Sequence, residues 1–169
     1  MFLLFLVKIE RFDETMKTIL FIGGYNSKGG KAETLRQKKG WKVYTLLPDY
    51  DTGLQQWVEK AEQILREHPV DEIHASSTGA LVACRFPHRK VLYSPVIDPF
   101  RQLREKIFSE KFLREAAVIE GCSLCTIIIP EEDDILFSSI TLAFCRKNHI
   151  TPVISKNDDH RLTRYFGNL

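Results

Sequence analysis

Short apolar runs alternate with amphipathic segments along most of the chain. Six runs rich in Val, Ile and Leu are predicted to be strands, at 18–22, 42–46, 72–75, 90–93, 125–129 and 151–155. Such runs are typical of parallel strands that are buried on both faces. Helices are predicted between and after them, at 31–39, 54–67, 78–85, 101–119, 135–148 and 162–166. The segment 54–67 has the clearest helical spacing of apolar residues, and Pro69 closes it.

This alternation predicts an α/β fold with three layers, in which helices cover both faces of a doubly wound, mostly parallel sheet. The length of 169 residues fits one domain, which we expect at 16–169. Residues 1–15 are predicted to be an N-terminal extension or an extra edge strand. They begin with an apolar run that lacks a basic start and a cleavage site, and that is too short to span a bilayer.

Composition narrows the function classes. The chain has 24 Lys and Arg against 22 Asp and Glu, so its net charge of +2 gives no electrostatic footprint for nucleic acid.

The chain has four cysteines, which predict reduced thiols in a cytoplasmic protein: Cys84, Cys122, Cys125 and Cys145. The Cys-x-x-Cys pair leads into a strand rather than a helix and has no second pair, so we expect buried thiols rather than a redox or zinc site. The histidines without ligand spacing are His68, His74, His88 and His149.

Residues 71–80 carry the most informative motif. An apolar run ends in Ala75-Ser76-Ser77-Thr78-Gly79 and passes into a helix-like segment. This is close to the G-x-S-x-G nucleophile elbow, which needs small residues around a serine at a strained turn, with Ala75 in place of the first glycine. The alternative is an ordinary strand-to-helix turn with an N-capping Ser or Thr.

A glycine-rich loop, residues 23–31, follows the first core strand. It does not fit a Walker A loop, because Tyr25 stands where the first glycine belongs and Ala32 replaces the hydroxyl that binds magnesium. No G-x-G-x-x-G fingerprint occurs either. Two interpretations remain: an ordinary strand-to-helix turn, or a loop that places the backbone N–H of Tyr25 in an oxyanion hole.

Two further candidates follow later strands. Residues 131–134 are four consecutive acids after the fifth core strand, and His160 follows the last strand. Each feature alone is typical of a solvated surface. Together with the elbow serine, however, they have the chain order Ser, acid, His of α/β-hydrolase triads.

Together, these motifs resemble those of the YqiA-like small esterases of the α/β-hydrolase superfamily. Residues 23–27 are similar to their HGFNS oxyanion segment, and residues 75–80 to their GSSLGG elbow. Residues 94–100 resemble their N-P-x-x-x-P-F stretch, residues 133–136 their D-E-V-L, and residues 157–160 their G-G-N-H. The resemblance departs at three places: Gly23 replaces a histidine, Ala75 replaces a glycine, and the loop before His160 carries two acids, Asp158 and Asp159, that the family's G-G-N-H lacks.

The resemblance implies a small α/β-hydrolase without a large lid. It assigns Ser77 as nucleophile, Asp133 rather than Asp134 as the acid, and His160 as the base. The oxyanion hole would consist of the N–H groups of Tyr25 and Thr78, supported by Gly23, Gly24 and Gly79.

The function expected on this basis is hydrolysis of a small carboxylic ester or thioester, with no metal or organic cofactor and with neither nucleic acid nor membrane as partner. A second hypothesis is a non-catalytic binding module that keeps the fold. A third is a phosphate- or nucleotide-binding domain that uses the Gly29-Gly30-Lys31 loop.

Overall fold

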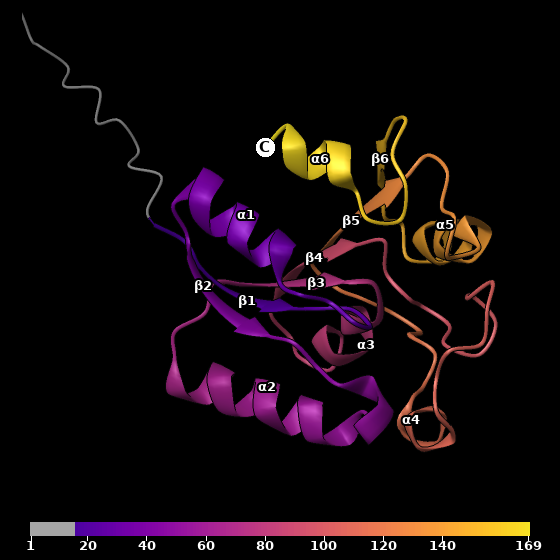
Figure 1. Ribbon diagram of the computed structural model, residues 1–169, viewed down its shortest axis with the longest axis horizontal. Coiled ribbons are helices and arrows are strands. Elements are labelled where there is room, and N and C mark those ends of the chain that lie inside the picture. The colour runs from indigo at the N-terminus through magenta and orange to yellow at the C-terminus, as the bar shows by residue number, and fades with distance from the viewer. Residues whose placement is uncertain (1–15) are drawn as a thin grey trace, which may run out of the picture.

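The computed structural model describes residues 16–169, so the extension or edge strand predicted at 1–15 lies outside the described residues. Within 16–169 the strands are β1 (Thr18–Ile22), β2 (Lys42–Leu46), β3 (Glu72–Ser76), β4 (Arg89–Tyr93), β5 (Cys125–Pro130) and β6 (Val153–Ser155). They form one sheet in the order β2-β1-β3-β4-β5-β6, and every pairing is parallel (Figure 1). The predicted doubly wound α/β fold is confirmed.

The helices are α1 (Gly30–Lys39), α2 (Gln55–Glu67), α3 (Ala80–Ala83), α4 (Glu110–Glu115), α5 (Ser138–Lys147) and α6 (Thr163–Gly167), with 3-10 turns η1 (Tyr50–Thr52) and η2 (Ser77–Gly79). Helices α1 and α6 cover one face of the sheet, and α2 and α3 cover the other (Figure 1).

The two faces of the sheet bury alternate residues of the strands. Ile19 and Phe21 pack with Leu35 of α1 on one face, whereas Leu20 and Ile22 belong to the larger cluster on the other face. Because side chains alternate along a strand, the continuous apolar runs seen in the sequence are what a sheet covered on both faces requires.

Residues 101–119 differ from the predicted helix, since only α4 forms there. Gln102 is fully buried, accepts hydrogen bonds from the backbone of Ile97 and Asp98, and donates to Pro95 and Thr141. Leu103 then pairs with Leu136 in an isolated antiparallel bridge. The backbone here pairs with residues far along the chain, because Arg104 N–H donates to the Ile135 carbonyl and Phe137 N–H donates to the Gln102 carbonyl.

Helix α5 begins three residues later than predicted. The backbone N–H groups of Ile135 and Leu136 donate to Asp133 Oδ1, and Leu136 forms the bridge to Leu103, so neither joins the helix. The predicted helix 78–85 is likewise shorter, because it consists of η2 and the single turn of α3.

Candidate active site

The turn after β3 has the geometry of a nucleophile elbow. Ser77 directly follows the strand and has a φ of +52°, a left-handed conformation that L residues rarely adopt. The chain then enters η2 and α3. The strained turn presents the Ser77 side chain at the carboxyl end of the sheet, where ligands bind in open α/β folds.

Two glycines allow the backbone to approach this turn closely. A Cβ on Gly79 would lie 2.5 Å from the carbonyl oxygen of Ile22, and one on Gly24 would lie 2.8 Å from Ser77 Cβ. A third, Gly23, is confined by Ser27 and Leu47, since a Cβ there would lie 2.8 Å from Ser27 Cβ. Glycine is therefore required at position 79 after the serine and at position 24 on the loop that faces it.

The structure brings Ser77, His160 and Asp133 together, although they follow three different strands. His160 Nε2 lies 3.0 Å from Ser77 Oγ. On the opposite side of the ring, His160 Nδ1 lies 3.1 Å from Asp133 Oδ1 and 3.0 Å from Oδ2. The three side chains thus form one continuous hydrogen-bonded chain.

Asp133 is buried and well supplied with donors. Its Oδ1 accepts from the N–H groups of Ile135 at 2.9 Å and Leu136 at 2.7 Å in addition to facing His160. Burial works against the charged carboxylate, but the hydrogen bonds from His160, Leu136 and Ile135 outweigh it and lower the pKa of Asp133. Asp133 is therefore an anion at neutral pH.

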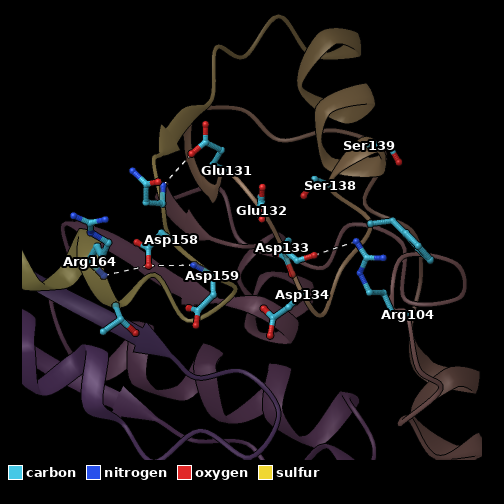
Figure 2. A pocket seen from close by; sticks show the side chains of 13 residues that line it. Arg104, Glu131, Glu132, Asp133, Asp134, Ser138, Ser139, Asp158, Asp159 and Arg164 are labelled. Atoms are coloured by element: carbon cyan, nitrogen blue, oxygen red, sulfur yellow. Dashed lines mark hydrogen bonds between the residues drawn. The ribbon is translucent and has the colours of Figure 1, made fainter.

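Asp134 has a different place. Its Oδ1 accepts from the backbone N–H of His160 at 3.1 Å, so it contacts the main chain of the histidine and not the ring. Arg104 donates to the backbone carbonyl of Asp133 at 3.1 Å, and Figure 2 shows this bond beside the two acids.

The loop that carries His160 is fixed by contacts that the sequence analysis missed. Ser94, buried after β4 with a φ of +44°, donates from Oγ to the carbonyl of His160 at 3.0 Å. Asp158 accepts from Ser155 Oγ and from the N–H groups of Arg164 and Tyr165. The sequence signals for Ser94 were its position directly after a predicted strand and its place at the start of the 94–100 motif, but neither indicated a contact with His160.

A cavity of about 770 Å³ opens over Ser77, and its lining also includes Gly24, Tyr25 and His160. Within residues 16–169, the N–H of Tyr25 donates to no protein acceptor, whereas its hydroxyl donates to Asp51. Thr78 is buried directly after the nucleophile. Of the two residues predicted for an oxyanion hole, Tyr25 therefore lines the same cavity as Ser77, and Thr78 directly follows Ser77 in the chain.

The remaining candidates lie away from this cavity. His74 is buried in β3 between Tyr93 Oη at 2.8 Å and Glu72 at 3.1 Å, as expected for a sheet histidine. Among residues 16–169 no cluster of His, Cys, Asp and Glu could hold a metal ion. Cys122 and Cys125 lie next to each other, with their Cα atoms 6.0 Å apart. Two Cα atoms at that separation are within disulfide range.

Three solved structures with the same fold are distant from this chain in sequence. A candidate hydrolase of the α/β superfamily from Xanthomonas campestris has a TM-score of 0.58 at 18% identity, covering 90% of this chain and 92% of that one. The ydeN gene product of B. subtilis has a TM-score of 0.59 at 16% identity, covering 85% and 87%. An α/β serine hydrolase homologue from Coxiella burnetii has a TM-score of 0.63 at 15% identity, covering 92% and 83%.

These likenesses establish the fold as that of the small α/β-hydrolases. No protein-family model matches the chain, and no curated protein matches it. Among residues 16–169, no helix has both the length and the apolar character needed to cross a bilayer.

Proposed function

We propose that this chain is a serine hydrolase that cleaves small carboxylic esters or thioesters through an acyl-enzyme. The observation that carries the proposal is the hydrogen-bonded chain from Ser77 Oγ through His160 to the buried carboxylate of Asp133, with Ser77 at a strained φ of +52°. The fold neighbours include an α/β serine hydrolase homologue, which agrees with this class of reaction.

In the first half-reaction, neutral His160 accepts the Ser77 hydroxyl proton at Nε2 while Oγ attacks the acyl carbonyl. Asp133 accepts the Nδ1–H hydrogen bond, which keeps the lone pair on Nε2 and stabilises the imidazolium that forms. The N–H groups of Tyr25 and Thr78 would bind the oxyanion of the tetrahedral intermediate. The leaving alcohol or thiol departs with the proton from Nε2.

In the second half-reaction, a water molecule gives a proton to His160 and attacks the acyl-Ser77 ester. Collapse of this second intermediate releases the acid and returns the proton to Ser77 Oγ. The scheme invokes no cofactor and no metal.

Turnover of 4-nitrophenyl acetate by Ser77→Ala tests the proposal. We expect kcat to fall by about 10⁴-fold or more, because the nucleophile acts as a unit with its base. Ser76→Ala is the matched control, since the neighbouring hydroxyl lies outside the hydrogen-bonded chain, and it should retain activity to within about tenfold. Equal activity of wild type and Ser77→Ala would contradict the proposal, and absence of turnover in the wild type would favour the binding-module hypothesis.

A further inference from the structure

The side chain of Lys31 contacts the turn that carries Ser77. It is the second residue of α1, and its Nζ donates to Ser76 Oγ at 3.1 Å. Ser76 directly precedes the nucleophile, and both serines and Lys31 line the same cavity. Lys31 therefore borders the cavity onto which Ser77 opens.

The charge of Lys31 is only partly compensated by the protein. In the part of the chain that the structure describes, Lys31 forms no ion pair; its other neighbour is the ring of Phe166, 5.7 Å from Nζ. Burial is the main cause that lowers the pKa of Lys31 to about 8. Repulsion from Arg161 also lowers this pKa, whereas attraction from Asp159 and Asp158 raises it. Lys31 is thus mostly charged at neutral pH and poorly solvated, and an anion bound beside it would be stabilised.

The nucleophile cavity is cationic as a whole. Its lining includes Lys28, Lys31, Lys38 and Arg161 and no Asp or Glu side chain. The first turn of α1 also lies on this cavity through Gly30, and the N-terminus of a helix carries positive partial charge.

The neighbouring cavity has the opposite character. It measures about 1080 Å³ and is lined by acids that include Glu131, Glu132, Asp134 and Asp159 (Figure 2). The loop that carries His160 lies between the two cavities, because Asp159 lines one and His160 and Arg161 line the other. Electrostatics therefore directs an anionic ligand to the side of Ser77 and away from the acidic side.

We propose that the substrate of this hydrolase carries an anionic group, a carboxylate or a phosphate, that binds Lys31 at the N-terminus of α1. The inference rests on the proposed function and names the substrate class of that site. It also accounts for the Gly29-Gly30-Lys31 loop, which fits neither a Walker A motif nor a dinucleotide fingerprint.

Two matched pairs of esters test the proposal by kcat/KM at pH 7. The carboxylate pair is mono-4-nitrophenyl adipate against 4-nitrophenyl hexanoate, and the phosphate pair is 4-acetoxyphenyl phosphate against 4-methoxyphenyl acetate. We expect at least about a tenfold preference for the anionic member of one pair, the size of one charge-assisted hydrogen bond. The pair that shows the preference identifies the anion. Equal values within both pairs would overturn the proposal.

Variants separate this role from a structural one. Lys31→Met should abolish the preference and Lys31→Arg should retain most of it, because the second variant keeps the charge. Lys39→Gln removes a lysine from the last turn of the same helix, outside the cavity, and should leave the preference unchanged. A Lys31→Met protein that keeps the full preference would show that Lys31 serves only to hold Ser76 and Phe166.

The wild-type protein gives a second readout that needs no variant. The ratio of kcat/KM within the preferred pair should fall between pH 7 and pH 9 as Lys31 loses its proton, while the shared groups Ser77, His160 and Asp133 cancel in the ratio. Three charged groups on the loop before α6 also affect the pKa of Lys31, namely Asp158, Asp159 and Arg161. Lys28 and Lys38 line the same cavity as Lys31. A ratio that stays constant to pH 9 would contradict the role of Lys31.

Calorimetry distinguishes failure of this inference from failure of the proposed function. If no ester is turned over, the hydrolase proposal fails and the subsite is judged on binding alone. Binding of adipate or of inorganic phosphate to the wild type, lost in Lys31→Met, would then uphold the anion site. No binding of either anion would overturn it.

Discussion

Two neighbouring acids at the end of β5 contact different parts of His160. Asp133 faces the ring nitrogen Nδ1 at 3.0 Å, whereas Asp134 accepts from the backbone N–H of the same residue at 3.1 Å. The ring contact can select the tautomer of the base, and the backbone contact can only position the loop. The geometry therefore supports Asp133 rather than Asp134 as the acid of the proposed triad.

Asn substitution at each position tests this assignment. We expect Asp133→Asn to lower kcat by about 10⁴-fold, because the amide favours the wrong tautomer of the imidazole. Asp134→Asn keeps an acceptor oxygen for the backbone N–H and should cost about tenfold or less. Measured kcat values for 4-nitrophenyl acetate decide between them. A larger loss in Asp134→Asn would mean that the assigned register is wrong by one residue.

At the scale of the elements, the elbow depends on how closely β1 approaches η2. Gly79→Ala would place a Cβ 2.5 Å from the carbonyl oxygen of Ile22, and neither backbone segment can move without disturbing the sheet. We expect a loss of about 1–3 kcal/mol in the free energy of unfolding, measured by urea denaturation, as for overpacking in a core.

Gly167→Ala is the matched control for Gly79→Ala. Gly167 also lies in a helix, but a Cβ there would meet no atom within 4 Å. Its stability should stay within about 1 kcal/mol of the wild type. If both variants were equally stable, the close approach at the elbow would not constrain the fold.

The connection between β6 and α6 depends on ionised Asp158. Burial raises the pKa of Asp158, but hydrogen bonds from the N–H groups of Tyr165 and Arg164, from Ser155 Oγ and from the N–H of Asp159 outweigh it, so the net pKa is lowered. A carboxyl group with a folded-state pKa below its unfolded value stabilises the protein above the unfolded pKa, about 3.9 for Asp. That contribution is lost as the pH falls below this value and through the folded pKa.

Asp158→Asn should therefore be less stable than the wild type at pH 7, by about 1 kcal/mol for the loss of a capping carboxylate. The difference should shrink at pH 3, where the wild-type carboxylate also takes up its proton. Urea denaturation at both pH values measures this difference in stability. Glu62→Gln, at an exposed position of α2, is the control for the change in net charge. A difference of the same size at pH 3 and pH 7 would contradict the role of the charge.

The local pattern of apolar and polar residues was sufficient to predict the elements that do not depend on contacts with distant parts of the chain. Helix α2 matches its predicted range to one residue, because its apolar spacing reports the face that packs on the sheet. The helix predicted at 101–119 was wrong for most of its length, since Gln102 and Leu103 are held by Thr141 and Leu136, more than 30 positions away. No local pattern carries that information.

For the whole molecule, the parallel sheet explains why three distant residues meet. Ser77, Asp133 and His160 each follow a strand, and the carboxyl ends of parallel strands share one edge of the sheet, so motif order along the chain was enough to name them. The contacts of Lys31 with Ser76 and of Ser94 with His160 depend on how helices and loops fold back across that edge. The sequence therefore predicts the three side chains that the structure brings together, but not the residues packed around them.

The most direct test of the central claim is the mass of the protein after treatment with a fluorophosphonate. An activated serine displaces fluoride and forms a stable phosphonate ester, whereas an ordinary surface hydroxyl does not react. We predict one adduct per chain, located on the peptide that contains Ser77, and its absence in Ser77→Ala and His160→Ala. A folded wild-type protein that gains no adduct, or that carries the adduct on a residue other than Ser77, would contradict the account.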